Sequence, residues 1–523
     1  MSEQWSFGRI ASAIGTAVDA DLPALIHGDT VTRWGAFDRR TDSLAARFLA
    51  AGAQPGDKVA HLMRNSPAYL ETAFAAFKAR LVHVNVNYRY TGEELWYILD
   101  NSDAFVVVYD AEFAAVVSEI RARLPGVGLW LQVGGDGSYE AAASADAALP
   151  AQDHAGDDML FIYTGGTTGY PKGVMWDQCV LWAMLGGGAA DFGGVPADGL
   201  EAHLANIRAG LGRRTMLVMP PLMHGSGFLM GVYTLLCGGA AITLPSPGFQ
   251  PFEALDACAR HRPTNAVIVG DAFARPLLRA LDNLGAGADI ASLQMIISSG
   301  TMWSPEVKAG LLRHNPGMIL IDALGSSESL GMGAAVQSAA NAGAPTRFVH
   351  DADTIVVDEA LRPVPAGTVG RIARGGPLPR GYYKDAAKTE ATFVTIDGKR
   401  YSMAGDHAVI EPDGTFTLMG RGNQCINTGG EKVFPEEVEE TLKSHPAVED
   451  ALVFGIADDK WGQAVTAVVE VATPADAAEI IAHVRLHLAA YKAPKQLHIV
   501  PKVPRAPNGK ADYAAAKVLA SAL

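Results

Sequence analysis

The sequence has few cysteines and no excess of positive charge. Its 523 residues include 4 cysteines, which lie far apart without the spacing of a disulfide framework or a metal site. This pattern fits a reducing compartment, so we expect a cytoplasmic protein. Lys and Arg number 42 against 56 Asp and Glu, which gives a formal net charge of −14. We therefore expect no nucleic-acid partner.

Charge is also missing from one long stretch, which raises the question of a membrane span. Residues 224–252 contain no Asp, Glu, Lys or Arg, and their length would suffice for a spanning helix. However, Gly238 and Gly239 interrupt the apolar run, and Pro245 ends it. We predict a buried helix, a turn and a buried strand over Ala240–Leu244, and no transmembrane segment. The first residues also lack the pattern of a signal peptide.

The most informative segment is a loop rich in glycine and threonine at residues 164–173. It follows the apolar run Met159–Tyr163, which is typical of a buried strand, and Val174–Trp176 resumes an apolar pattern after it. Glycines let the backbone approach a ligand closely, while threonine hydroxyls, backbone N–H groups and Lys172 suit a polyphosphate. A Walker A loop is excluded, because Gly rather than Ser or Thr follows Lys172. The alternative is a surface loop without a ligand.

Strand-like and helix-like patterns alternate along the chain, which predicts an α/β fold. Residues 42–51 are predicted to form a helix that Asp42 caps and Gly52 ends, with Leu44 and Phe48 on its inner face. Buried strands are predicted at residues 106–108, 266–269, 295–297, 451–456 and 464–471.

The length predicts more than one domain, since single domains rarely exceed ~250–300 residues. Near residues 420–423 the composition changes, and a compact βαβ-like unit follows, with Pro435 in the first turn of a helix. We predict a large multi-sheet N-terminal domain, residues 1–421, and a small C-terminal domain, residues 422–523.

The loop and five further motifs resemble the adenylate-forming superfamily of acyl-CoA synthetases, luciferases and peptide-synthetase adenylation domains. They occur in the family's order and span most of the chain. The further motifs are Pro220–Gly225, Gly325–Glu328, Gly405-Asp406, Gly420-Arg421 with Gly429–Glu439, and Asn508–Lys510.

This resemblance implies a two-step reaction. A carboxylate attacks the α-phosphate of ATP to give an acyl-adenylate and pyrophosphate, and a thiol, usually coenzyme A, then displaces AMP. It also implies a large domain and a small mobile one that take two orientations, with the hinge near Asn423. The first step joins two anions, so positive charge and geometry matter more than a protein nucleophile.

The resemblance assigns four catalytic candidates. Lys510 bridges the carboxylate and the α-phosphate, Lys172 belongs to the phosphate loop, and His224 lies at the mouth of the acyl pocket. Glu328 holds Mg²⁺ beside the phosphates, which agrees with the preference of this ion for one or two carboxylates. The alternatives are a solvated terminal lysine for Lys510, a satisfied core histidine for His224, and a first-turn helix glutamate for Glu328.

The nucleotide and pantetheine contacts also follow from the resemblance. Asp322 meets the adenine amino group, Asp406 accepts the ribose hydroxyls beside Arg421, and Ser327 binds a phosphate. A turn aspartate is the alternative for Asp406. Leu324 departs from the aromatic residue usual in the family. The complete cofactor-binding set is Thr164, Gly165, Gly166, Thr167, Thr168, Gly169, Gly300, Thr301, Met302, Asp322, Ala323, Leu324, Gly325, Ser326, Ser327, Asp406, Arg421, Gly429 and Gly430.

Several stretches are most similar to the bacterial branch that acts on steroid side-chain acids and long acyl chains, among them residues 163–176 and 270–277. We therefore expect a hydrophobic carboxylic acid, either a fatty acid or the side chain of a steroid or bile acid. Asp271 leaves an amino-acid substrate open, since it could supply a counter-charge. The expected pocket residues are Gly225, Phe228, Gly270, Asp271 and Phe273.

Two other functions stay open at this point. The enzyme could deliver its acyl group to a carrier-protein thiol, or the chain could bind a nucleotide without turnover. Retention of Lys510 argues against the second, because a pure binding protein does not need it. No Lys/Arg cluster identifies a site for the coenzyme A 3′-phosphate. A homodimer is compatible with the sequence, which does not set the oligomeric state.

Overall fold

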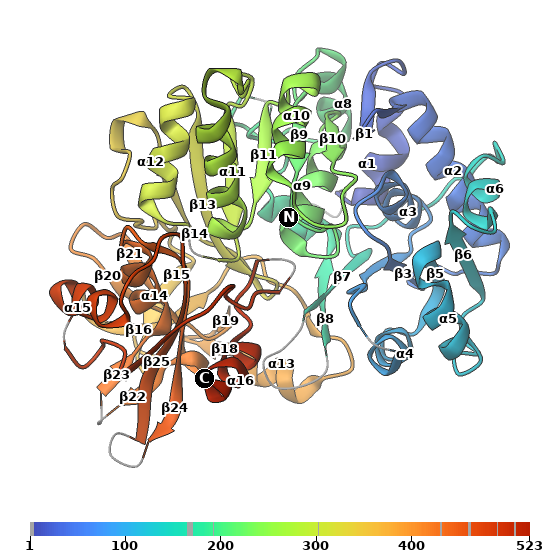
Figure 1. The fold of residues 1–523 in the computed structure, drawn as a ribbon. Helices are drawn as coiled ribbons and strands as arrows, with labels where there is room; N and C mark the ends of the chain where they lie inside the picture. The colour runs from blue at the N-terminus through green and yellow to red at the C-terminus, as the bar shows by residue number, and fades with distance from the viewer. Residues whose placement is uncertain are drawn as a thin grey trace.

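The structure is a computed structural model that describes the chain except residues 1–4, 91, 165–170, 192, 302, 429–430, 459–461, 489 and 507–508. Four sheets organise the described residues, and helices cover them (Figure 1). The α/β fold with several sheets in the large N-terminal part is confirmed.

Two mostly parallel sheets form the N-terminal part. The seven-stranded sheet has the order β17-β8-β7-β4-β3-β5-β6. Its strands are β3 (Lys58–Leu62), β4 (Val82–Asn85), β5 (Ala104–Asp110), β6 (Leu129–Val133), β7 (Met159–Thr164), β8 (Lys172–Asp177) and β17 (Gly381–Tyr382). The eight-stranded sheet has the order β14-β13-β12-β11-β9-β10-β1-β2. Its strands are β1 (Pro23–His27), β2 (Thr30–Arg33), β9 (Thr215–Val218), β10 (Ala240–Thr243), β11 (Asn265–Ile268), β12 (Met295–Ser299), β13 (Ile319–Ser326) and β14 (Ser329–Gln337).

One apolar core joins these two sheets through the helices between them. Leu25 and Val218 of the eight-stranded sheet and Val106 and Leu160 of the seven-stranded sheet belong to the same buried cluster. The helices of this core include α1 (Phe7–Ile14), α2 (Trp34–Ala50), α3 (Pro67–Lys78) and α9 (Gly225–Leu236). The opposite faces are covered by α10 (Pro251–His261), α11 (Gly270–Leu284) and α12 (Pro305–His314), and by α4 (Gly92–Asn101) and α5 (Ala114–Arg121). Ligands of such sheets bind beyond the carboxyl ends of the parallel strands, where the connecting loops lie.

A third, antiparallel sheet follows in the chain. It has the order β18-β19-β16-β20-β21, and β15 pairs with β16. Its strands are β15 (Thr354–Val357), β16 (Val369–Arg374), β18 (Phe393–Ile396), β19 (Lys399–Ser402), β20 (Asp406–Ile410) and β21 (Phe416–Arg421). Helix α13 (Ala386–Thr392) precedes β18.

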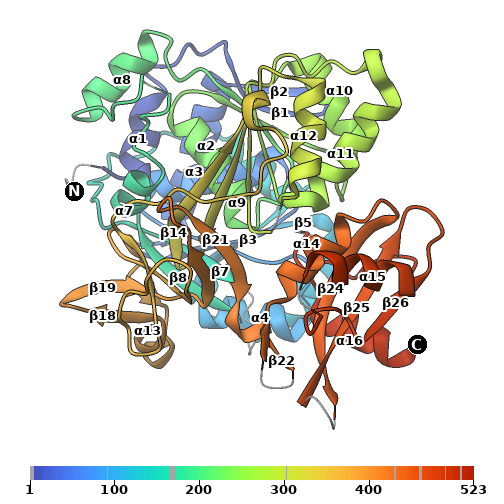
Figure 2. The same cartoon turned by 90° about the vertical axis from the view of Figure 1, so that its left-hand side faces the viewer.

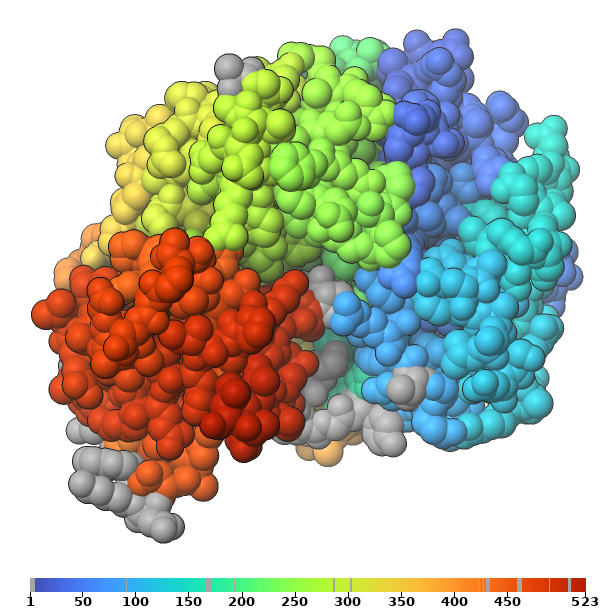
Figure 3. Space-filling view, viewed as in Figure 1, coloured from blue at the N-terminus to red at the C-terminus, as the bar shows by residue number. Residues whose placement is uncertain are grey.

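Residues 426–523, here called the C-terminal unit, build the fourth sheet on their own. Its order is β23-β22-β25-β24, and β26 pairs with β25. Its elements are β22 (Ile426–Thr428), β23 (Glu431–Val433), α14 (Pro435–Lys443), β24 (Val448–Asp458), β25 (Gly462–Val471), α15 (Ala477–His487), β26 (Gln496–Ile499) and α16 (Tyr513–Ala522). Two views show this unit beside α11 and α12 (Figures 1 and 2), and its orange-to-red surface abuts their yellow-green surface in Figure 3.

The uncharged stretch forms the elements expected of it. Helix α9 is followed by a turn at Gly238-Gly239 and by β10 in the middle of the eight-stranded sheet. Among the described residues, no helix has both the length and the apolar character that crossing a membrane requires.

The predicted helix start at Asp42 is wrong. Helix α2 begins at Trp34, because Trp34 and Phe37 are only 1% exposed and extend its buried face by two turns. Asp42 lies inside the helix and pairs with the buried Lys78 at 2.7 Å instead of capping. The end of this helix just before Gly52, which has φ +99, and the burial of Leu44 and Phe48 are confirmed.

Candidate functional site

The predicted phosphate loop connects two strands of a hairpin. The sequence predicts a strand on each side of this loop, and the structure adds that β7 and β8 pair antiparallel, with Thr164 opposite Lys172. Residues 165–170, which include the predicted contacts Gly165, Gly166, Thr167, Thr168 and Gly169, lie outside the described residues. Lys172 forms an ion pair with Asp385, the cap residue of α13, and its hydrogen bond lowers the pKa of the Asp385 carboxyl. A cation is therefore held at the base of the loop.

Glu328 lies in the tight turn between β13 and β14, next to this hairpin. The Trp176 indole of β8 donates a hydrogen bond of 2.9 Å to the Ser327 carbonyl, which fixes the turn against the hairpin. The Tyr382 hydroxyl donates one of 2.7 Å to Glu328 Oε1. Glu328 Oε2 has no hydrogen-bond partner among the described residues. The alternative of a helix start at Ser327-Glu328 is wrong, because two strands flank the turn.

The expected adenine contacts lie on β13, whose register places Asp322 beside Ser298 of β12. Asp322 is buried, and its Oδ2 accepts a hydrogen bond of 3.0 Å from the buried Lys308. Burial raises the pKa of Asp322, and the Lys308 charge opposes this rise. Ala323, Leu324, Gly325 and Ser326 follow Asp322 along the same strand. Leu324 packs partly buried against the core of the third sheet.

Lys510 reaches the strand ends from the C-terminal unit. Its Cε lies 3.7 Å from the position that a Cβ would take at Gly300, which follows β12 with φ +96. Thr301 comes next in the chain, whereas Met302 lies outside the described residues. The positive charge of Lys510 also contributes to lowering the pKa of His224. The fold thus joins three predicted site residues, Lys510, Gly300 and His224, that are far apart in the sequence.

His224 precedes α9 and supplies a neutral ring to this region. Its Nε2 is buried and has no hydrogen-bond partner among the described residues. Burial, with a smaller contribution from the Lys510 charge, lowers the pKa of His224 to about 3. His224 is therefore not a core histidine with all of its hydrogen bonds formed, since its buried Nε2 has no partner among the described residues.

The expected ribose contacts lie at the paired ends of β20 and β21. Asp406, which is 8% exposed, begins β20, and Arg421 ends β21 directly opposite it in the ladder. Gly405, with φ +101, accepts a backbone hydrogen bond from Gly422 at 2.9 Å. The side chains of Arg421 and of the predicted hinge residue Asn423, and both Gly429 and Gly430, lie outside what the structure describes.

The predicted pocket residues separate into different places. Phe273 lines a cavity of about 130 Å³, while Gly225 begins α9 against Ile162 of β7. Gly270 begins α11 and donates its N–H to Ser298 Oγ at 2.9 Å. Phe228 is 2% exposed and stacks on His83 with ring centroids 4.0 Å apart, so its ring packs in the core.

Asp271 has its carboxylate fully engaged. It pairs with Arg275 at 3.2 Å and with Lys443 at 3.4 Å, and it accepts hydrogen bonds from the N–H and hydroxyl of Ser304. Burial works against its ionisation, but the charges of Lys443 and Arg275 outweigh that effect and lower the pKa of Asp271. This arrangement argues against a role as the counter-charge for an amino-acid substrate.

The sequence missed the cavity that Phe273 lines. Two arginines from separate loops, Arg64 and Arg89, border it together with Ser246 and Pro221. Arg64 is paired with Glu112 at 2.6 Å, whereas Arg89 is exposed. No sequence cluster could have revealed them, because the fold brings together the ends of β3, β4, β9 and β10. The sequence signal that could have identified them is a basic residue shortly after a predicted strand, as Arg64 follows β3 and Arg89 follows β4.

Two protein-family models match the chain. Residues 15–383 match the family model described as AMP-binding enzyme, and residues 437–510 match the model described as AMP-binding enzyme C-terminal domain. The second match falls within the C-terminal unit.

Two curated relatives cover nearly the whole chain. The 3-oxocholest-4-en-26-oate–CoA ligase of Rhodococcus rhodochrous is 37% identical, over 97% of this chain and 95% of its own. The medium/long-chain-fatty-acid–CoA/3-oxocholest-4-en-26-oate–CoA ligase of Mycolicibacterium smegmatis is 36% identical, over 97% and 96%. Among solved structures, the anthranilate CoA ligase AuaEII in complex with anthranoyl-AMP has a TM-score of 0.85 at 22% identity, over 100% of this chain and 99% of that chain. This likeness concerns the fold.

Proposed function

The chain belongs to the AMP-binding enzyme family, and from this premise we propose that it is an ATP-dependent ligase that joins a hydrophobic carboxylic acid to coenzyme A. The observation that supports this most directly is the position of Lys510 beside Gly300 and His224. A cation from one unit meets the strand ends of another, where carboxylates and a glycine-rich hairpin suit a nucleotide.

In the first step, a carboxylate oxygen of the acid forms a bond to the α-phosphorus of ATP. The bond from that phosphorus to the bridging oxygen breaks, and pyrophosphate leaves with its electron pair. Both reactants are anions, so the ammonium of Lys510 lowers the barrier by binding the carboxylate and the α-phosphate together. Lys172 holds the phosphate chain from the hairpin, while Asp322, Asp406 and Arg421 hold the adenosine.

Glu328 fits a role in holding Mg²⁺. One of its oxygens is fixed by Tyr382, and the other has no partner among the described residues. A Mg²⁺ ion takes one or two carboxylates together with phosphate oxygens and water, and it neutralises phosphate charge when bound. The described residues contain no cluster of three or more His, Cys, Asp or Glu suited to a metal, which is compatible with an ion that arrives with ATP.

His224 contributes a neutral, partly buried ring near the same point. Because its pKa is lowered to about 3, it carries no charge at neutral pH and does not attract the acid electrostatically. We assign it to the mouth of the acyl pocket, where its unpartnered Nε2 can hydrogen-bond the acid or its adenylate.

In the second step, the thiol of coenzyme A attacks the acyl carbon, its proton is lost, and AMP leaves with the bonding electrons. We propose that the C-terminal unit turns near Asn423 and that Gly429 and Gly430 give the pantetheine arm its path. The cavity bordered by Arg64 and Arg89 suits the phosphates of coenzyme A, because the exposed Arg89 lines it and Arg64, although paired with Glu112, adds a second basic residue. A cytoplasmic location agrees with the small number and wide spacing of the four cysteines.

The substrate is a fatty acid or the side-chain acid of a steroid. The two relatives described above are named for such acids, and the engagement of Asp271 argues against an amino acid.

The test is carboxylate-dependent AMP release with ATP and Mg²⁺, with and without coenzyme A. The panel is octanoate, palmitate, benzoate, a bile acid and a C24 sterol acid. Turnover of a fatty or steroid acid that requires coenzyme A supports the proposal and identifies the class of acid that is the substrate. Pyrophosphate release without any effect of coenzyme A would favour a carrier-protein acceptor instead.

A further inference from the structure

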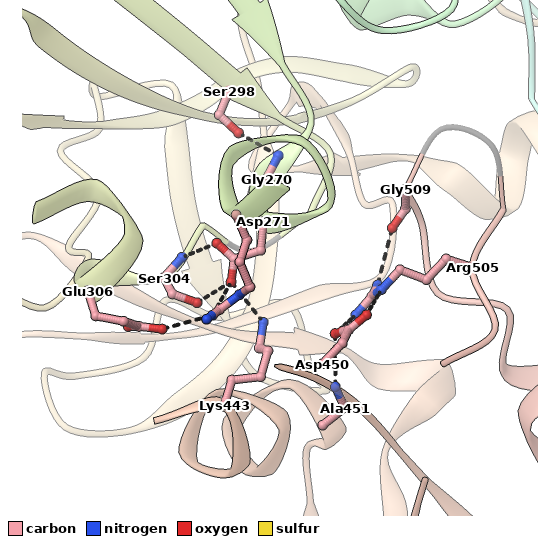
Figure 4. A network of polar contacts seen from close by, with 11 residues as sticks. Gly270, Asp271, Ser298, Ser304, Glu306, Lys443, Asp450, Ala451, Arg505 and Gly509 are labelled. Atoms are coloured by element: carbon pink, nitrogen blue, oxygen red, sulfur yellow. Dashed lines mark hydrogen bonds and ion pairs between the residues drawn. The ribbon is translucent and has the colours of Figure 1, made fainter. Parts of the chain in front are cut away.

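A buried ion pair joins the C-terminal unit to the large N-terminal part. Lys443 ends α14, and its Nζ lies 3.4 Å from Asp271 Oδ2 in the first turn of α11 (Figure 4). The two side chains are 6% and 11% exposed, respectively. A pair this buried is sensitive to the loss of one partner, because the remaining charge is then left in a poorly solvated place.

The surroundings of Lys443 are acidic, and its positive charge offsets the charge of these carboxylates. Burial raises the pKa of Glu440 on the same helix, Lys443 opposes this rise, and Glu306 and Asp271 add to it. Glu306 and Asp271 belong to the N-terminal part, whereas Glu440 belongs to the C-terminal unit. Without Lys443, carboxylates would face one another across the interface with less compensation.

The same interface positions the loop that carries Lys510. A Cβ at Gly509 would lie 2.5 Å from Cβ of Ala272, the residue after Asp271, so this glycine is pressed against α11. Within the C-terminal unit, Arg505 donates a hydrogen bond of 3.1 Å to the Gly509 carbonyl while it pairs with Asp450 (Figure 4). Arg279 of α11 and Glu449, next to Asp450, form a second ion pair across the interface.

We infer that Lys443 is a positioning residue which, by pairing with Asp271, selects the orientation of the C-terminal unit that brings Lys510 beside Gly300 and His224. This inference rests on the proposed function for its catalytic consequence. In any orientation that separates α14 from α11, both charges are free to meet water, and Asp271 keeps Arg275 and Ser304 as partners. Loss of Lys443 therefore penalises the docked orientation relative to others, because only there do Asp271 and Glu440 stay poorly solvated without the charge that offsets theirs.

The test is Lys443→Met, assayed on each half-reaction separately. We expect carboxylate-dependent adenylate formation to fall by about tenfold or more, because the docked orientation is less populated. Thiolation of supplied acyl-adenylate should stay the same or rise. Lys443→Arg should restore part of the adenylation rate, since it returns the positive charge.

A matched control is Lys492→Met. Lys492 pairs with Glu437 at 2.6 Å, and both residues belong to the C-terminal unit, so its loss removes an ion pair without breaking one across the interface. Both half-reactions should change little. Equal loss of both half-reactions in Lys443→Met, or the same split in Lys492→Met, would overturn the inference.

The rate of chemical labelling at an introduced cysteine does not depend on catalysis, so it tests this inference separately from the proposed function. In a Glu449→Cys background, the thiol at position 449 replaces a side chain that is only 12% exposed against Arg279 of α11 when the unit is docked. Labelling by a maleimide, located by mass spectrometry, should be several-fold faster when Lys443→Met is added, and unchanged when Lys492→Met is added. Equal labelling rates in all three proteins would overturn the inference, even if the enzyme accepted none of the acids tested.

Discussion

The Tyr382 hydroxyl donates a hydrogen bond of 2.7 Å to Glu328 Oε1 and so fixes the carboxylate proposed to hold Mg²⁺. Tyr382 belongs to β17, which pairs with β8 of the phosphate-loop hairpin. The contact therefore ties the carboxylate to the strand that carries Lys172.

Tyr382→Phe should raise the KM for Mg²⁺–ATP about 5- to 20-fold, since a hydrogen bond to a charged group contributes about 1.5–3 kcal/mol and part of it is replaced by water. The KM for the acid should change little. Steady-state kinetics at varied ATP and Mg²⁺ measure both. Tyr401→Phe is the control, because Tyr401 is a buried tyrosine of β19 in a different core cluster. An unchanged KM for ATP in Tyr382→Phe would contradict this role.

Lys510→Ala should lower adenylate formation by at least about 100-fold, because it removes the cation that joins the two anions. Thiolation of supplied acyl-adenylate should largely persist. Pyrophosphate exchange and single-turnover thioester formation measure the two steps. Lys517→Ala on α16 is a matched control in the same unit and should leave both rates unchanged. Equal loss of both half-reactions in Lys510→Ala would exclude the assigned role.

Arg89→Ala should raise the KM for coenzyme A by about 5- to 20-fold and leave adenylation unchanged, because it removes a guanidinium group from the cavity proposed for the phosphates. Dephospho-coenzyme A, which lacks the 3′-phosphate, reports whether that group is the one recognised. Arg121→Ala, at an exposed arginine stacked on Trp130, serves as the control. If Arg89→Ala leaves coenzyme A kinetics unchanged, the cavity has another use.

Stability should fall as pH falls from about 7.5 to 5.5. Burial lowers the pKa of His61 and of His224 to about 3 and that of His83 well below its usual value. The unfolded chain, with histidine pKa near 6.5, then binds more protons than the folded one, so acid favours unfolding. Each such histidine should remove about 1.4 kcal/mol of unfolding free energy per pH unit below ~6.5.

Urea unfolding of the apoprotein at several pH values measures this slope. His61→Gln should reduce the slope by the contribution of about one histidine, whereas His487→Gln, at an exposed histidine, should leave it unchanged. A slope in His61→Gln that equals the slope of the unchanged protein would show that His61 does not stay neutral in the folded state.

Local sequence patterns determined much of the architecture. The hairpin of β7 and β8, the buried helix α9 with the following strand β10, and the start of α14 at Pro435 all lie where apolar periodicity and turn residues predict them. Such elements depend on neighbouring residues, so the chain specifies them locally. The start of α2 could not be predicted in the same way, because burial of Trp34 against distant residues extends that helix.

Only the tertiary structure decided which residues meet. Asp271 and Lys443 are 172 positions apart, and Lys510 approaches Gly300 and His224 because the C-terminal unit packs on α11. Arg64 and Arg89 likewise share a cavity because separate parallel strands end at the same place. Motifs predict the type of each group, but distances and pairing arise from the docking of surfaces, which no local pattern encodes.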